Sequence, residues 1–115
     1  MRLPEAENSV IEPRKLRDYL LSPMHPVGRF KAVFFARLGY NQDDWGTLAA
    51  DLRIHAIEGE AIEVGPSPFR RKFEVRGQIR GPSGYRAEIV TVWIILESED
   101  RPRLITAYPE QDRDI

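Results

Sequence analysis

The chain contains no cysteine and only two histidines, His25 and His55, among its 115 residues. The absence of thiols excludes disulfides, zinc–thiolate sites, iron–sulfur clusters and cysteine nucleophiles. A metal site would therefore have to be built from histidines and carboxylates, and the sequence contains no paired-histidine metal motif. We accordingly expect neither a metal nor any other cofactor.

Long apolar runs are also absent. No segment approaches the roughly 20 apolar residues that are needed to cross a bilayer. The first part of the chain contains Glu5, Glu7 and Glu12 and lacks the apolar stretch of a secretory signal. These features predict a cytoplasmic protein that does not interact with a membrane.

Hydrophobic residues make up 42% of the chain and charged residues 30%, which is the balance of a globular protein. We expect an extended lead-in over residues 1–12, a single domain over residues 13–109 and an acidic tail over residues 110–115. The net charge is only -1, yet residues 65–86 carry six basic side chains against one acidic side chain. Positive charge is therefore concentrated locally, where it could attract a phosphate backbone or an acidic partner.

Apolar residues at spacings of three and four predict three helices in the first half of the chain. They cover residues 13–21, residues 27–38, and residues 41 to about 58. Pro23 and Pro26 separate the first two, because each proline restricts the residue before it to extended geometry. On the second helix, the expected buried stripe is Val27, Phe30, Phe34 and Leu38, with Val33 beside it.

The period changes to two residues in the second half, as expected for strands. The predicted strands are residues 73–80, 85–96 and 104–108, and residues 62–64 could add an edge strand. Short turns join them, so they should form an antiparallel meander. The predicted fold class is α+β: two to three N-terminal helices packed on one face of a three- to four-stranded antiparallel sheet.

His25 and Lys31 are the first candidates for chemistry. Histidine can exchange a proton near neutral pH, and the position of His25 between Met24 and Pro26 would hold it at the edge of a cleft. Lys31 lies on the polar side of the second helix, where its charge could stabilise a phosphorane-like transition state. Each could equally be an ordinary solvated side chain. His55, near the end of the third helix, is expected only to complement the helix dipole.

Four polar residues of the sheet could contact a phosphate. Arg76 and Arg80 line one face of their strand, and the guanidinium group matches phosphate geometry. Thr106 and Tyr108 alternate on the last strand, where a hydroxyl could orient a phosphate and a phenol could stack on a base. Thr91 is a further polar group in the central strand. Strand alternation and strand propensity alone would also account for these residue types.

Three stretches resemble a bacterial domain family of unknown function: KLRDYLLSPMHPVGRFKAVFFARLGY, TVWIILE and PRLITAYPE. This resemblance runs from about Lys15 to Pro109 and implies no particular activity. A more distant resemblance concerns the order of elements. Helices followed by an antiparallel meander, with a His/Lys segment and a final strand reading Thr-x-Tyr-Pro, are similar to the barnase, EndoU, colicin and RelE (BECR) type of toxin ribonuclease.

The second resemblance implies a BECR-like fold and cleavage of RNA without a metal. The implied catalytic residues are His25, Lys31, Thr106 and Tyr108, and the implied phosphate-binding residues are Arg76 and Arg80. On this hypothesis His25 removes the proton of the 2′-hydroxyl, and the product carries a 2′,3′-cyclic phosphate. A second well-placed histidine is missing, so the general acid is unassigned. A toxin must be restrained in the cell, which implies a cognate antitoxin or immunity protein of acidic character.

Two other functions stay open at this point. A non-catalytic RNA- or protein-binding module would use the basic strand for docking and would show saturable, salt-sensitive binding without cleavage. A small-molecule or structural accessory domain, oligomeric through a strand edge, would be insensitive to substitution of His25 and Lys31.

Overall fold

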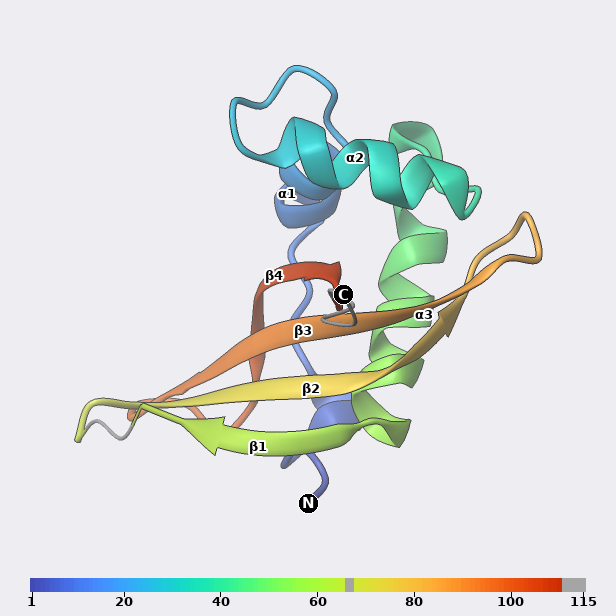
Figure 1. Cartoon of the computed structure of the whole chain (residues 1–115). Helices are drawn as coiled ribbons and strands as arrows, with labels where there is room; N and C mark the ends of the chain where they lie inside the picture. Colours follow the sequence, from blue (N-terminus) through green and yellow to red (C-terminus); the bar gives the residue numbers. More distant parts are fainter. Residues whose placement is uncertain (66–67, 111–115) are drawn as a thin grey trace, which may run out of the picture.

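The computed structural model of the chain describes residues 1–65 and 68–110. Four antiparallel strands form one sheet in the order β1-β2-β3-β4 (Figure 1). Their bounds are Glu60–Val64 for β1, Arg70–Arg80 for β2, Arg86–Leu96 for β3 and Arg103–Pro109 for β4. Strands that are neighbours in the sheet are also neighbours along the chain, so the predicted meander is confirmed, including its edge strand.

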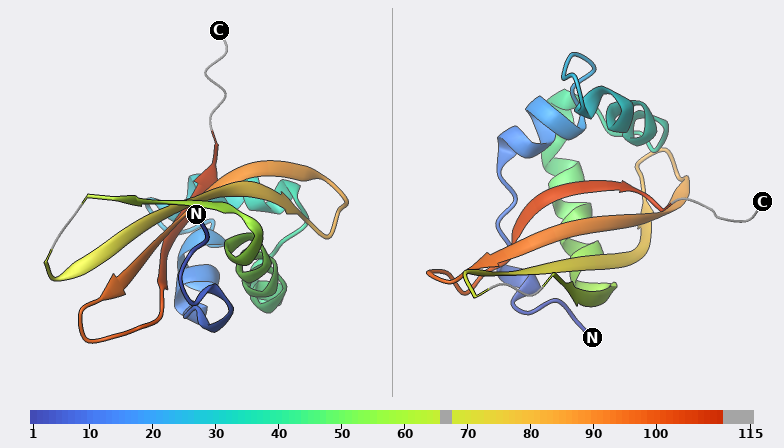
Figure 2. Two further views of the ribbon diagram at one scale, coloured as in Figure 1. Left: turned by 90° about the horizontal axis from the view of Figure 1, so that it is seen from below. Right: turned by 60° about the vertical axis from the view of Figure 1, so that its left-hand side comes forward.

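Three helices precede the sheet. α1 spans Pro13–Lys15 and continues directly into a π-helical turn, Leu16–Leu20, while α2 spans Gly28–Arg37 and α3 spans Trp45–Glu58. α3 packs on β2, whereas α1 and α2 both contact β4 (Figures 1 and 2). The predicted α+β class is therefore confirmed. None of the helices in the described ranges has the length and apolar character needed to cross a membrane.

One face of the sheet packs against the helices and forms the core. The sheet contributes Phe73, Val75, Ile89 and Trp93 to this core, and the helical segments contribute Leu16, Leu20, Phe35, Leu48 and Leu52. Burial of this apolar surface is the main stabilising contribution to the fold. The opposite side, which we call the outer face, carries Glu74, Arg76, Val90, Val92 and Tyr108.

α2 buries a different side from the one that the sequence predicts. Gly28, Ala32 and Phe35 are buried, together with Leu38 just beyond the helix. The expected stripe residues Val27 and Phe30, and Val33 beside them, are exposed. The predicted stripe is therefore wrong for these residues. The physical reason is that Gly28 and Ala32 are small, so the backbone of α2 can pack closely against its neighbours on that side. Hydrophobic spacing alone does not indicate such packing.

Residues 1–12 pack against the rest of the domain rather than standing apart as a lead-in. Leu3 and Ala6 are buried, and Val10 forms a parallel bridge with Arg103 of β4. The packing therefore shows no boundary at residue 12. Of the acidic tail expected over residues 110–115, Glu110 is described, and residues 111–115 lie outside the described residues.

Candidate active site

A cavity of about 680 Å³ lies between the first helical segment, the connector that follows it, and β4. Its lining consists of Arg14, Lys15, Asp18, Tyr19, His25, Val27, Ile105 and Thr106. We call it the Tyr19 cavity. Two of the predicted catalytic residues, His25 and Thr106, lie together in it although they are far apart in the sequence.

Tyr19 is the centre of this site. Its hydroxyl is hydrogen-bonded to Thr106 Oγ1 at 3.0 Å, and its ring meets the His25 ring edge-on with centroids 4.9 Å apart. The Nζ atoms of Lys31 and Lys15 lie 5.5 and 5.9 Å from the Tyr19 ring centroid. Three predicted residues, His25, Lys31 and Thr106, are thus gathered around Tyr19, which was not among the predicted site residues.

Two local irregularities shape the cavity walls. Tyr19 lies in the π-helical turn, a wider turn than an α-helix makes and one that is frequent at functional sites. In β4, Leu104 pairs with Trp93 and Thr106 pairs with Val92, so Ile105 is the extra residue of a β-bulge. A bulge bends its strand and re-aims its side chains. Here two consecutive residues, Ile105 and Thr106, both line the cavity.

His25 caps the start of α2. Its Nδ1 atom accepts hydrogen bonds from the backbone N–H groups of Val27, at 3.0 Å, and Gly28, at 2.9 Å. A neutral imidazole whose Nδ1 accepts must carry its hydrogen on Nε2. In this arrangement, therefore, His25 can donate a hydrogen bond through Nε2 but cannot take up a proton at Nδ1 without giving up the cap.

Gly28 allows α2 to lie against Tyr19. A Cβ atom at Gly28 would overlap the backbone carbonyl of Tyr19 and would also crowd the Tyr19 ring. Only glycine has no side chain to displace here. This close approach keeps Lys31, on the first turn of α2, and His25, just before the helix, beside Tyr19.

Positive charge predominates around the cavity. Arg14, Lys15 and Lys31 lie in or beside it, while Asp18 is paired with Arg17 at 2.9 Å. The Arg17 guanidinium lowers the pKa of the Asp18 carboxyl, chiefly through their hydrogen bond. A cluster of cations around hydroxyl groups suits a phosphate.

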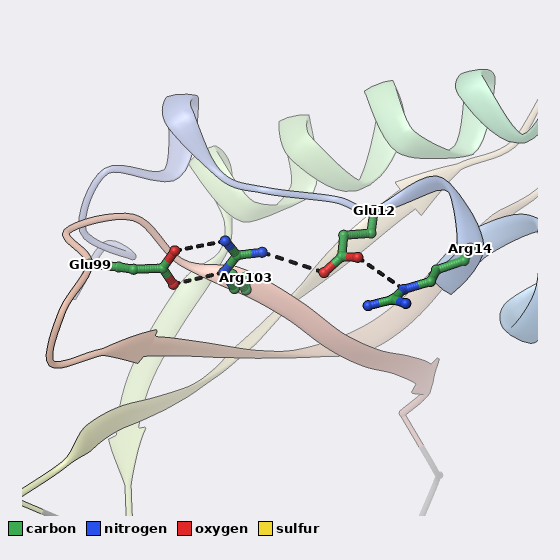
Figure 3. A network of polar contacts seen from close by, with 4 residues as sticks. All are labelled: Glu12, Arg14, Glu99 and Arg103. Carbon is green, nitrogen blue, oxygen red and sulfur yellow. Dashed lines mark hydrogen bonds and ion pairs between the residues drawn. The ribbon is translucent and has the colours of Figure 1, made fainter.

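An ion-pair network joins the two walls of the cavity (Figure 3). The Glu12 carboxylate accepts from Arg14 Nε at 3.0 Å and from Arg103 Nη1 at 3.4 Å. Arg103 also donates to both carboxylate oxygens of Glu99, each at 2.7 Å. Such partly exposed pairs stabilise only weakly, so their main effect is to hold the start of α1 against the start of β4.

The other predicted residues lie on the outer face. Tyr108, Val90 and Arg76 lie in one cross-strand row, which Glu60 of β1 continues. Burial, and then the nearby Glu74 carboxylate, raises the pKa of Tyr108, so its phenol keeps its proton and can donate at neutral pH. Arg76 is engaged by Glu74 at 3.1 Å and by Glu110 at 3.0 Å. Arg80 is at the far end of β2.

His55 and Thr91 are structural rather than available to a substrate. Both are buried, and His55 Nε2 lies 3.1 Å from Thr91 Oγ1 and 3.2 Å from the carbonyl oxygen of Val75. Trp93 Nε1 donates to the same hydroxyl at 2.7 Å. Burial lowers the pKa of His55. The expectation that His55 complements the helix dipole with a charge is therefore wrong, because the neutral form is favoured.

Within residues 1–65 and 68–110, no three histidine or carboxylate side chains are grouped so that they could hold a metal ion. The chemistry that this site offers consists of hydrogen-bond donors, hydroxyls and cations. That set can bind and polarise a phosphodiester.

Comparison with known proteins adds a family and a fold. Residues 2–111 match the model of the family described as Domain of unknown function (DUF6883). No curated protein matches the chain significantly. A chain of the solved contact-dependent growth inhibition toxin–immunity protein complex from Klebsiella pneumoniae 342 is similar with a TM-score of 0.67 and 17% identity, covering 94% of this chain and 98% of that chain. At this identity the likeness shows a shared fold.

Proposed function

We propose that this chain, which belongs to the DUF6883 family of domains of unknown function, is a metal-independent endoribonuclease toxin. A cognate antitoxin or immunity protein would be its partner. The observation that carries the proposal is the gathering of His25, Lys31, Lys15 and Thr106 around Tyr19. The fold shared with a chain of a toxin–immunity protein complex supports it. The substrate would be RNA in the cytoplasm.

The proposed reaction is transesterification within RNA. The 2′-oxygen attacks the adjacent phosphorus and the 5′-oxygen leaves, while a proton passes through solvent from the attacking to the leaving oxygen. One product ends in a 2′,3′-cyclic phosphate and the other in a 5′-hydroxyl. Lys15 and Lys31 stabilise the added negative charge on the phosphorus oxygens. Thr106, held by Tyr19, orients the phosphate in the cavity.

His25 takes a role different from that of a general base. A neutral imidazole at a helix N-terminus can donate a hydrogen bond to the charge that develops in the transition state. The Nε2–H group of His25 is suited to this, because its Nδ1 atom is occupied by the amides of Val27 and Gly28. Tyr108 and Arg76 would contact the RNA strand along the outer face, where a phosphate must replace Glu74 or Glu110 as the partner of Arg76.

Two substitutions of His25 separate these roles. His25→Asn keeps an acceptor for the α2 amides and loses the donor at the Nε2 position, whereas His25→Gln can keep that donor and loses the cap. We expect His25→Asn and Lys31→Ala each to slow cleavage by roughly 100-fold. His25→Gln should retain more activity than His25→Asn. If His25 is instead a general base, the two substitutions should be equally inactive.

The measurement is cleavage of total bacterial RNA by the purified chain in the presence of EDTA, with detection of cyclic phosphate ends. Arg101→Ala is the control, because Arg101 is an exposed cation in the turn before β4, outside both the Tyr19 cavity and the outer face. Intact RNA after incubation with folded wild-type protein would contradict the proposal. Salt-sensitive RNA binding without cleavage would then indicate the non-catalytic binding module.

A further inference from the structure

α2 presents large apolar side chains to solvent. Phe30 is 69% exposed and Val33 is 57% exposed, one turn apart on the same helix, and Val27 precedes them. Contiguous exposed apolar surface of this kind is typical of an interaction site. Nothing in the Tyr19 cavity requires Phe30 or Val33, since neither lines it.

An apolar groove runs beside these side chains. It has a volume of about 540 Å³, and its walls include Leu21, Phe30, Val33, Ala36 and Tyr40. We call it the α2 groove. It is large enough to receive one or two apolar side chains of another protein, which is how a buried anchor contributes most to an interface.

The charged side chains of α2 are all positive. The sequence has no Asp or Glu from residue 19 to residue 42, and this stretch includes Arg29, Lys31 and Arg37. None of these three cations takes part in an ion pair within the part of the chain that the structure describes. The Arg29 guanidinium instead lies 4.7 Å from the Phe30 ring centroid. Unpaired cations around an apolar centre complement an acidic surface that carries apolar anchors.

The α2 groove and the Tyr19 cavity share one segment of chain. Pro23 and Arg29 line the groove, while His25 and Val27, which lie between them in sequence, line the cavity. A protein that occupied the groove would therefore contact the connector that carries His25. It could stop catalysis by covering this connector and neutralising Lys31.

We propose that the α2 groove is the docking site of an acidic inhibitor protein that inserts apolar side chains beside Phe30 and Val33. This inference rests on the proposed toxin function and names the surface by which the toxin is restrained. A second copy of this chain is disfavoured as the occupant, because self-association through α2 would bring like charges together. RNA is disfavoured because the centre of the surface is apolar.

The experiment uses the full chain and, as the probe, the purified product of the gene adjacent to the one that encodes it. Binding is measured by calorimetry at two salt concentrations. Two double variants are compared with the wild type. Phe30→Ser with Val33→Ser removes the apolar side chains that the inhibitor would contact, and Arg29→Glu with Arg37→Glu reverses the charge of α2. Ile62→Ser is the control, because Ile62 is an exposed apolar residue on β1, away from α2. Thermal unfolding verifies that each variant is folded.

We expect both double variants to bind the probe at least about tenfold more weakly than the wild type, with the charge-reversal variant also losing salt sensitivity. Ile62→Ser should bind like the wild type, and every variant should cleave RNA like the wild type when the probe is absent. The double variants should continue to cleave RNA when the probe is present.

Other outcomes overturn the inference. Failure of the probe to bind the wild type, binding that neither double variant weakens, or an equal loss in Ile62→Ser would each do so. If, without the probe, the Arg29→Glu, Arg37→Glu variant is the only one to lose RNA cleavage, the surface binds RNA instead. If no chain cleaves RNA but the expected pattern of binding holds, the docking site stands and the proposed ribonuclease activity fails.

Discussion

Tyr19 combines two contacts that a single substitution can separate. Its ring packs beside His25, Lys15 and Lys31, and its hydroxyl holds Thr106 at 3.0 Å. Tyr19→Phe keeps the ring and removes the hydrogen bond, so we expect a loss of stability of only about 1 kcal/mol. RNA cleavage should fall by roughly tenfold or more, because a misplaced phosphate reacts slowly.

Thr106→Val is the partner substitution in a double-mutant cycle. If the hydroxyl of Tyr19 acts by holding Thr106, the double variant should lose no more activity than either single variant. The measurements are initial rates of RNA cleavage together with urea unfolding of all four proteins. Additive losses of activity would contradict the positioning role and would indicate that each hydroxyl contacts RNA independently.

His55 makes the stability of the fold depend on pH. Burial lowers its pKa below the ordinary value of 6.5, whereas in the unfolded chain it should titrate near that value. Above this pH the full stability is present. As the pH falls below 6.5, the unfolded state binds a proton that the folded state resists, and the free energy of unfolding falls by up to about 1.4 kcal/mol per pH unit.

Urea unfolding between pH 7.5 and pH 5.5 tests this expectation. His55→Gln should be less stable than the wild type at every pH, by roughly 1–3 kcal/mol, because it disturbs a buried hydrogen-bond network. Its stability should nevertheless vary less with pH over this window. A wild-type slope in His55→Gln would mean that other groups cause the pH dependence.

Residue type was enough to select several members of the site but not its centre. His25, Lys31 and Thr106 stood out as candidates because each is able to donate a proton, a hydrogen bond or a positive charge. Tyr19 fits a helical apolar stripe as well as it fits an active site, so its role depends on what β4 places opposite it. The burial of His55 was also unpredictable, because its partners Val75 and Thr91 come from two strands of the sheet.

At the scale of elements, the helices and strands followed from periodicity, whereas the orientation of α2 did not. Hydrophobic spacing selects a stripe of large residues, but α2 buries Gly28 and Ala32 and leaves Phe30 exposed. Close packing against the Tyr19 backbone determines this orientation. The β-bulge at Ile105 was equally hidden, since it results from pairing with Val92 and Trp93 and not from any local sequence signal.

Gly28→Ala tests how closely α2 must pack. The new methyl group would overlap the carbonyl of Tyr19, so α2 should shift away, at a cost of roughly 1–3 kcal/mol in the free energy of unfolding. The shift should also separate His25 and Lys31 from Tyr19 and reduce RNA cleavage by more than the loss of folded protein explains. Urea unfolding and cleavage rates on the same samples measure both effects.

Gly46→Ala, in the first turn of α3, is the matched control. Within the described part of the chain, a Cβ atom at Gly46 would meet no other atom within 4 Å. Alanine is the better helix former, so this variant should be more stable than the wild type by about 0.5–1 kcal/mol, with unchanged cleavage. A Gly28→Ala variant as stable and active as Gly46→Ala would show that α2 can move without consequence.

At the scale of the whole molecule, the structure pairs two of the six basic residues of segment 65–86 with carboxylates. Arg71 is paired with Glu63 of β1 at 2.9 Å, and Arg76 with Glu74 and Glu110. Glu74 lies on the same strand as Arg76, whereas Glu63 comes from β1 and Glu110 follows β4, so a count over residues 65–86 could not reveal these last two partners. The other four, Arg70, Lys72, Arg80 and Arg86, are exposed, so the segment keeps positive charge that an acidic partner or a phosphate can reach.

The N-terminal segment contacts the rest of the chain across the domain boundary predicted at residue 12. Leu3 and Ala6 belong to the core, the N–H of Val10 donates to the carbonyl of Pro102 at 2.8 Å, and the N–H of Leu104 donates to the carbonyl of Val10 at 3.0 Å. A chain that lacks residues 1–11 should lose these contacts together. We expect its free energy of unfolding to fall by roughly 3–5 kcal/mol, a large part of the stability of a domain of this size.

Urea unfolding of the shortened chain measures this loss, and two substitutions in the full chain give it a scale. Leu3→Ala should cost about 2–3 kcal/mol, because it leaves a cavity in the core, whereas Glu7→Ala, at an exposed position, should cost almost nothing. β4 forms a wall of the Tyr19 cavity and is bridged to Val10, so the shortened chain should also lose RNA cleavage. A shortened chain with wild-type stability would instead place the boundary of the folding unit at residue 12, as the sequence alone predicts.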